Sequence, residues 1–177
     1  MEIVLTINGN KRQVEVIGAE TLLDLLRRLG YKSVKFGCGE GACGVCTVLM
    51  DGRPVNSCLI LAVTAEGREI TTVDDLGTVQ KPHVLQTAFV ETGAVQCGFC
   101  TPGMILASKA LLDRNASPTV DEIKEALDGN LCRCTGYVQI IEAVQLAARR
   151  IRAKKKTGSK KKKKPAKKSK KKITKKA

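Results

Sequence analysis

Eight cysteines, divided into two sets of four, constrain this 177-residue chain more than any other feature. The first cysteine set is Cys38, Cys43, Cys46 and Cys58, and the second cysteine set is Cys97, Cys100, Cys132 and Cys134. Thiols at such close spacing form disulfides, bind zinc or hold an iron–sulfur cluster. In both metal-binding cases the fold must bring four thiols together twice.

Disulfide formation, the first of these outcomes, requires an oxidising compartment. The chain opens with MEIVLTI, which is too short and lacks the basic segment of a secretory signal peptide. No apolar run approaches the length that spans a bilayer. We therefore expect a cytoplasmic protein whose cysteines are reduced and bind metal.

The first cysteine set begins with C-x4-C-x2-C, the plant-type spacing for a [2Fe–2S] cluster held by four thiolates. Four glycines surround it, namely Gly37, Gly39, Gly41 and Gly44. Residues without a Cβ allow backbone N–H groups to approach an anionic cluster and can adopt positive φ. Zinc is the alternative, but zinc sites usually use C-x2-C pairs on both sides and do not need such a loop.

The second cysteine set combines C-x2-C with a distant C-x-C, a pattern that could also hold zinc. Cys97 and Cys100 precede a helix start at Thr101–Pro102, and the other pair precedes a helix that begins near Tyr137. Two helix N-termini would therefore direct their partial positive charge at one anionic centre. This placement favours an iron–sulfur cluster and leaves zinc open as the alternative.

The N-terminal part of the chain alternates between strand and helix patterns. Apolar and polar residues alternate over 3–16 around an Asn8-Gly9-Asn10 turn, which predicts a hairpin. A leucine stripe over 21–30 predicts a helix that ends at Gly30, and 47–55 predicts a second hairpin that turns at Asp51-Gly52. These elements indicate a small mixed sheet crossed by one helix.

The C-terminal part is helical after a polar linker at 74–82. We predict helices over 82–92, from Thr101 to about 112, after the capping box Thr119–Glu122, and over 137–152. The chain has no Trp, two Tyr and three Phe, so any core must be mainly aliphatic. We expect two modest cores, one formed by the leucine stripe of the first part and one by the apolar faces of these helices.

The basic charge is confined to the C-terminus. Residues 154–177 contain fifteen lysines and no acidic residue, so the other 16 basic and 17 acidic residues nearly balance. Such a segment cannot bury enough apolar surface to fold. We expect a disordered tail that is either merely solvated or attracted to nucleic acid, a membrane or an acidic protein face. The predicted fold is α+β, with units at 1–76 and 77–152 and the tail at 153–177.

Three stretches give the chain a resemblance to a known family. They are GCGEGACGVCTV at 37–48, VQCGFCTPGMI at 95–105 and NLCRCTGY at 130–137. With both cysteine sets in this order, residues from about 2 to 150 resemble the iron–sulfur subunit of the molybdenum hydroxylase (xanthine dehydrogenase) family. The eleven-residue gap before Cys58 is similar to that in the small subunits of aldehyde oxidoreductases and carbon monoxide dehydrogenases.

The resemblance implies a β-grasp, plant-type ferredoxin-like unit followed by a four-helix [2Fe–2S]-binding bundle. It implies an electron-transfer subunit with two [2Fe–2S] clusters. Its partners would be a large subunit with a molybdenum–pterin cofactor and a medium subunit with FAD, in a dimer of heterotrimers. Electrons would pass singly from molybdenum to the second cysteine set, then to the first, and on to FAD or another acceptor.

The resemblance also suggests roles for single residues. Gln96 matches a glutamine that contacts the pterin, although without the resemblance it would read as a solvated polar residue. Cys134 is placed where the second cluster would approach the pterin, so it would be both a cluster ligand and the electron exit. Glu40 is expected to be a surface charge and His83, the only histidine, a surface or capping residue.

Two rival functions follow from the same residues. One is a stand-alone two-cluster ferredoxin-type carrier, and the other is a basic nucleic-acid-binding module with zinc ligands. In the preferred interpretation the chain is the iron–sulfur subunit of an oxidoreductase complex and turns over no substrate by itself.

Overall fold

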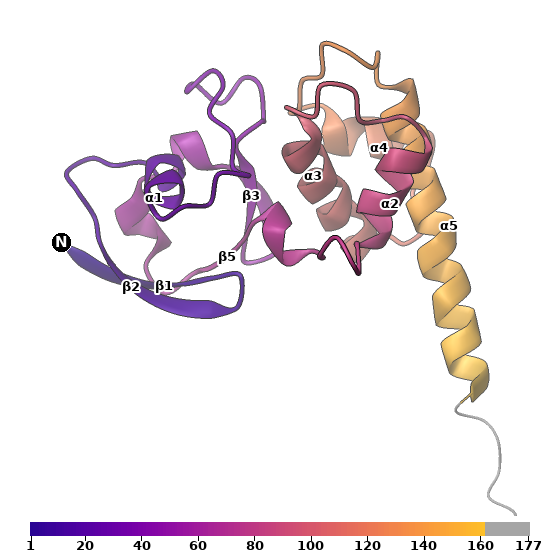
Figure 1. Cartoon of the computed structure of the whole chain (residues 1–177), viewed down its shortest axis with the longest axis horizontal. Helices are drawn as coiled ribbons and strands as arrows, with labels where there is room; N and C mark the ends of the chain where they lie inside the picture. Colours follow the sequence, from indigo (N-terminus) through magenta and orange to yellow (C-terminus); the bar gives the residue numbers. More distant parts are fainter. Residues whose placement is uncertain (162–177) are drawn as a thin grey trace, which may run out of the picture.

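A computed structural model describes residues 1–161, with side chains up to Lys154, and shows an α+β molecule (Figure 1). A five-stranded sheet with one helix forms the N-terminal part, and four further helices follow. No helix among residues 1–161 is long and apolar enough to cross a membrane.

Both predicted hairpins are confirmed. β1 (Glu2–Ile7) pairs antiparallel with β2 (Asn10–Glu15), and Asn8 and Gly9 turn between them at φ 51° and 72°. β3 (Thr47–Met50) pairs with β4 (Arg53–Asn56) through a similar turn. Positive φ at both central residues matches the twist of the flanking strands.

A fifth strand, β5 (Glu69–Thr71), joins the two hairpins and was not predicted. It lies parallel to β1 and antiparallel to β3, which gives the sheet order β2-β1-β5-β3-β4. Three residues are too short for an alternating pattern to be recognised. The strand therefore depends on its two neighbours.

Helix α1 (Leu22–Arg28) packs on this sheet. Its N-cap is Thr21, whose side chain accepts a hydrogen bond from the Asp24 N–H at 3.1 Å. Leu22, Leu25 and Leu26 of the predicted stripe are buried in the first core. Leu29 is 36% exposed because it follows the helix as its C-cap.

The second core is formed by α2 (Val84–Glu91), α3 (Thr101–Arg114), α4 (Val120–Leu127) and α5 (Val138–Lys161). The predicted capping box of α4 is present, with Thr119 and Glu122 bonding reciprocally. The start of α3 differs by one residue. Its N-cap is Cys100, and Thr101 is the first helical residue.

Helix α5 is longer than predicted. We expected a disordered tail from residue 153, but the helix continues to Lys161. Lysine and alanine are good helix formers, and lysine near a C-terminus interacts favourably with the helix dipole. The rest of the predicted tail, residues 162–177, lies outside the described residues.

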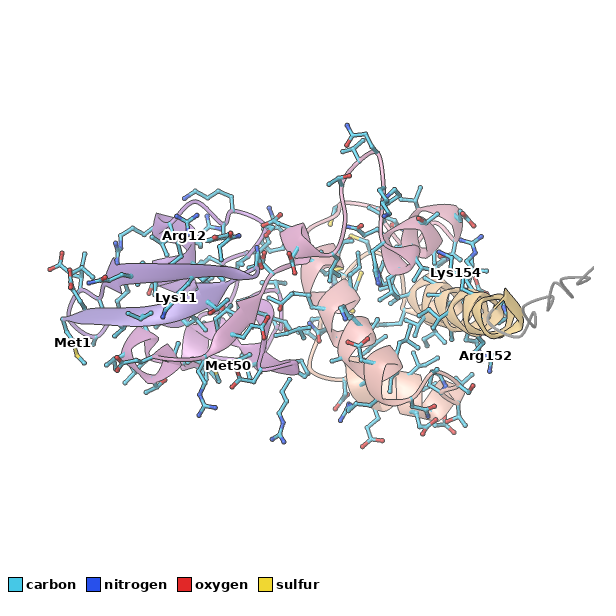
Figure 2. All side chains as sticks on the ribbon, turned by 90° about the horizontal axis from the view of Figure 1, so that it is seen from below. Met1, Lys11, Arg12, Met50, Arg152 and Lys154 are labelled. Carbon is cyan, nitrogen blue, oxygen red and sulfur yellow. The ribbon has the colours of Figure 1, made fainter. Side chains whose placement is uncertain are left out.

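The sheet and the helices meet along β3 and α3. Leu49 on β3 packs with Leu106 and Ala110 on α3, and the partly buried Val73 and Leu76 complete this cluster. Figure 2 shows the sheet with Lys11 and Arg12 at one end of the molecule and Arg152 and Lys154 on α5 at the other. The β3–α3 contact positions the loops that carry the cysteines.

Candidate iron–sulfur centres

The cysteine-bearing loops lie side by side along one edge of the molecule. In Figure 1 the loops over 36–46, 94–100 and 129–137 occupy the upper edge. Cys58 reaches the first loop from the short 3₁₀ helix Ser57–Leu59. None of the eight cysteines forms a disulfide. The predicted division into two sets is therefore also a division in space between the sheet and the helices.

Within the first cysteine set the thiols lie close enough to influence one another. Cys38 interacts with Cys43, and Cys58 interacts with Cys46 and, to a smaller extent, with Cys38. Backbone N–H groups point at the outer pair, since the Cys38 N–H donates to Cys43 Sγ at 3.4 Å and the Glu40 N–H donates to Cys38 Sγ at 3.5 Å. Donors of this kind stabilise the negative charge of thiolates and of the cluster they bind.

The thiols of the second cysteine set are also close together. Cys97 Sγ and Cys134 Sγ lie 3.6 Å apart, and Cys100 interacts with Cys132 and, to a smaller extent, with Cys97. The Thr135 hydroxyl donates to Cys132 Sγ at 3.2 Å. These ligands come from two loops, and α3 begins directly after Cys100.

The donor chemistry suits iron–sulfur clusters. Each set consists of four cysteines, the number of thiolates that holds a [2Fe–2S] cluster. Two thiolates on one tetrahedral metal lie about 3.8 Å apart when the metal–sulfur distance is about 2.3 Å. The 3.6 Å separation of Cys97 Sγ and Cys134 Sγ is close to that value, so these two thiols suit one metal. The donor sets therefore fit two [2Fe–2S] clusters.

Burial controls the protonation of the inner thiols. Desolvation raises the pKa of Cys58 to about 11 and that of Cys100 to about 12. The exposed Cys38 has its pKa lowered to about 7, chiefly by the Glu40 N–H and then by Cys43. Without metal the buried thiols stay protonated at neutral pH, so cluster binding must release their protons.

At two glycines of the first loop, neighbouring atoms lie too close to leave room for a side chain. A Cβ on Gly37 would lie 2.8 Å from Cys43 Sγ. A Cβ on Gly44 would lie 2.1 Å from the carbonyl oxygen of Gly129, and the φ of Gly44 is 67°. Gly39 and Gly41 also have positive φ, whereas Gly37 does not. Gly37 is therefore required because a side chain would not fit there, and not because of its backbone conformation.

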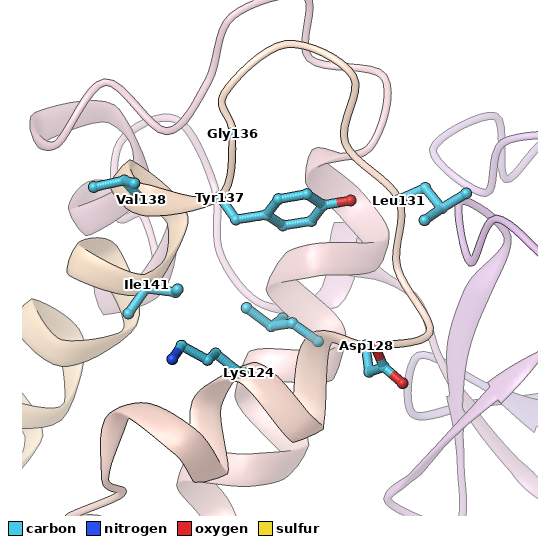
Figure 3. Close-up of a pocket in the computed structure, with 8 residues that line it drawn as sticks. Lys124, Asp128, Leu131, Gly136, Tyr137, Val138 and Ile141 are labelled. Carbon is cyan, nitrogen blue, oxygen red and sulfur yellow. The ribbon is translucent and has the colours of Figure 1, made fainter.

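Side chains around the second set were not recognised from the sequence. The Cys132 N–H donates to the Tyr137 hydroxyl at 3.0 Å, and Figure 3 shows this ring reaching from the start of α5 across a cavity of about 530 Å³. Tyr137 has φ 70°, which is uncommon for a residue other than glycine. Its presence in the NLCRCTGY stretch was the only available signal.

The remaining predicted residues lie as follows. Gln96 and Glu40 are exposed, and the pterin contact of Gln96 stays a prediction. His83 is the N-cap of α2, and its Nδ1 accepts a hydrogen bond from the Leu85 N–H at 3.3 Å. Burial lowers its pKa, so it is a neutral capping residue near pH 7.

Two family models match consecutive parts of the chain. Residues 5–76 match the 2Fe-2S iron-sulfur cluster binding domain, and residues 72–145 match the [2Fe-2S] binding domain. Each matched region contains one complete cysteine set. The metal content predicted from the cysteine spacing is therefore supported independently in both halves.

Several named proteins are similar to most of the chain. The nicotinate dehydrogenase small FeS subunit of Eubacterium barkeri is 52% identical over 147 residues, which are 82% of this chain and 94% of that one. The xanthine dehydrogenase iron-sulfur-binding subunit of Escherichia coli O157:H7 is 49% identical over 78% of this chain and 89% of that subunit.

Solved structures are also similar to most of the chain. A chain of quinoline 2-oxidoreductase from Pseudomonas putida 86 has a TM-score of 0.82 at 46% identity, covering 86% of this chain and 96% of that one. The aldehyde oxidoreductase of Desulfovibrio desulfuricans has a TM-score of 0.83 at 42% identity, but only 17% of that longer chain is covered. The same fold therefore occurs both as a separate chain and within a longer one.

Proposed function

We infer the function of this chain from its family, because it belongs to the iron–sulfur subunits of the molybdenum hydroxylases. It is an electron-transfer subunit of an oxidoreductase complex and carries two [2Fe–2S] clusters. The observation that carries this conclusion is that each of the two matched [2Fe–2S] domains contains one complete set of four cysteines. Each cluster, when bound, accepts and releases one electron.

The ligands follow from the two sets. The first cluster would be held by Cys38, Cys43, Cys46 and Cys58, and the second by Cys97, Cys100, Cys132 and Cys134. The chain orients the thiols, directs N–H groups at them and excludes water from the buried ones. The unit boundaries that we propose are 1–76 and 77–152, with the basic tail from 153.

The partners are proposed from the relatives and from the surface. Both sets reach solvent through exposed thiols, namely Cys38 in the first and Cys97 and Cys134 in the second. Exposed apolar residues accompany each of them: Phe36 and Leu59 near the first, and Val95 and Phe99 near the second. An exposed cluster edge with an apolar border suits a redox partner that docks closely.

We assign the second face to a large subunit with molybdenum–pterin, contacted by Gln96, and the first face to a medium subunit with FAD. Electrons then run from molybdenum through the second and first clusters to FAD or another acceptor. The complex would be a dimer of heterotrimers, located in the cytoplasm, and substrate turnover would need the large subunit.

The stand-alone carrier is not favoured, because the relatives are themselves named as subunits. The zinc-binding, nucleic-acid-binding alternative is not favoured either, since both halves match [2Fe–2S] families. Attraction of the lysine-rich segment to an anionic surface remains a proposal from its charge.

Metal and sulfide analysis tests the proposed function. The full chain, purified anaerobically, is expected to contain about four irons and four acid-labile sulfides. After reduction with dithionite it should show two distinct EPR signals from the two reduced clusters. Stoichiometric zinc with no EPR signal would overturn the proposal.

A further inference from the structure

The two cysteine loops are joined at a buried junction centred on Asn130. Asn130 is 6% exposed and lies two residues before Cys132. Its Nδ2 donates to the Gly44 carbonyl at 2.8 Å and to the Thr47 hydroxyl at 3.2 Å. Gly44 directly follows Cys43, so one side chain from the second loop holds the backbone of the first.

A backbone hydrogen bond runs beside this side chain. The Leu131 N–H donates to the Cys43 carbonyl at 2.9 Å. Cys43 is a proposed ligand of the first cluster, and Leu131 is bonded to Cys132, a proposed ligand of the second. The connection between the two ligands therefore contains only covalent bonds and one hydrogen bond. The electronic coupling between two redox centres is far stronger along such a bonded path than across a gap without bonds.

The junction is packed without free space. A Cβ on Gly103, in the first turn of α3, would lie 2.5 Å from the Gly44 carbonyl oxygen and 2.9 Å from Asn130 Nδ2. On its other side Gly44 lies against Gly129. The backbone around Gly44 is thus enclosed between α3 and the loop that carries Cys132, and a Cβ added at Gly44 or at Gly103 would force these segments apart.

We propose that Asn130 is a positioning residue for electron transfer between the two clusters. It fixes the first loop against the second and keeps the Cys43–Leu131 hydrogen bond short. With both clusters bound, one electron would pass from the reduced second cluster to the oxidised first cluster, with no proton moved and no bond changed. The inference rests on the proposed function, since it requires both clusters.

The rest of the interface does not depend on Asn130. Leu49 packs against Leu106 and Ala110 at a separate position. The Gly44 carbonyl also accepts from the Thr47 N–H at 3.1 Å and from its hydroxyl at 2.7 Å. An Asn130→Ala variant therefore leaves no carbonyl unpaired at Gly44, and the two parts should stay in contact.

The test uses the full chain with both clusters and three variants. Asn130→Ala removes the two donors. Gly103→Ala adds a Cβ against the Gly44 carbonyl oxygen and Asn130 Nδ2. The variant should keep α3 folded, because alanine favours helix more than glycine does. The matched control is Asn56→Ala, because Asn56 Nδ2 donates to the Gly41 carbonyl of the same loop at 2.9 Å, and its link to the junction is a long hydrogen bond, 3.5 Å, that its Oδ1 accepts from the Thr47 hydroxyl.

Two measurements report the junction directly. The first is the splitting of the EPR signals by spin–spin interaction when both clusters are reduced, which weakens as they move apart. The second is the rate at which an electron, injected by a laser flash with a deazaflavin, redistributes between the clusters. In Asn130→Ala and Gly103→Ala we expect a weaker splitting and a several-fold slower redistribution, with unchanged midpoint potentials. Asn56→Ala should behave as the wild type.

The outcomes separate this inference from the proposed function. Two normal clusters with unchanged splitting and rate in Asn130→Ala would overturn the positioning role alone, as would an equal loss in Asn56→Ala. If Asn130→Ala loses a cluster, Gly103→Ala decides, and unchanged coupling there overturns the role. A wild-type chain without iron–sulfur signals would overturn the proposed function together with the inference.

Discussion

The two cysteine sets are built in different ways. In the first, three of the four cysteines lie within nine residues, on a loop held by its own N–H groups and by glycines. In the second, two cysteine pairs from separate loops meet only because α2 to α5 pack around a common core. The first site is therefore largely local in the sequence, whereas the second depends on tertiary structure.

The two sets also differ in exposure. The first exposes Cys38 and buries Cys46 and Cys58, while the second exposes both Cys97 and Cys134. A cluster whose ligands depend on packing and whose edge is open should lose iron more readily. We therefore expect the second cluster to be the more labile of the two, and the predictions below test this difference.

The largest effect is expected from Cys134→Ser. This change removes one thiolate of the second set, so the chain should retain about two of about four irons. The second EPR signal should disappear, and the plant-type signal of the first cluster should remain. Loss of the plant-type signal instead would show that the ligand sets are assigned to the wrong halves.

Truncation of a core residue should affect the clusters unequally. Phe89→Ala removes a fully buried ring from the helical core and should cost about 3–5 kcal/mol. Iron release to a chelator should become faster for the second cluster, as followed by the decay of its EPR signal. The first cluster should decay at the wild-type rate.

Leu25→Ala is the matched variant in the first core. Leu25 is also fully buried, and its truncation should cost about 2–5 kcal/mol. Here the first cluster should be lost faster. If both variants destabilise both clusters equally, the two cores unfold as one unit and the contrast between them is wrong.

The sequence predicted the local features well. The hairpins, the α4 capping box and the helix of the leucine stripe all depend on residues within a few positions of one another. The C-x4-C-x2-C loop is local in the same sense. Such patterns are set by backbone geometry and capping, which short segments carry by themselves.

What could not be predicted depends on distant contacts. β5 has three residues and forms only between β1 and β3. Asn130 contacts Gly44, 86 positions away, and nothing in either segment indicates the other. The length of α5 was underestimated because a lysine-rich composition suggested disorder although lysine favours helix. The two cysteine sets could thus be recognised from the sequence, whereas the contact between their loops could not.

A smaller effect is expected from helix capping. Thr119→Ala removes the α4 cap and should cost about 1 kcal/mol. Because α4 lies between the two cysteine pairs of the second set, iron release should become faster there alone. Thr21→Ala removes the equivalent cap of α1 and should affect only the first cluster. Equal effects on both clusters would contradict the separation of the two parts.

The smallest effect concerns an exposed ion pair that joins α2 to α5. Glu91 and Arg150 form two hydrogen bonds, and Arg150 lowers the pKa of the Glu91 carboxyl. A carboxyl with a lowered pKa in the folded state adds stability above its unfolded pKa, and this stability is lost as the pH falls through the folded value. Both partners are solvent-exposed, so the gain is small and falls with salt.

The pair can be tested with Glu91→Gln, using thermal unfolding followed by circular dichroism. The variant should melt slightly below the wild type at pH 7. The difference should shrink once the pH falls below about 4.3, the ordinary pKa of Glu, and vanish below the lowered folded pKa of Glu91. Glu20→Gln removes the comparable pair with Arg28 in the first part. Only Glu91→Gln should also speed iron loss from the second cluster, since Glu91 holds a helix of that core. A difference in melting that grows towards acid pH would contradict the lowered pKa of Glu91.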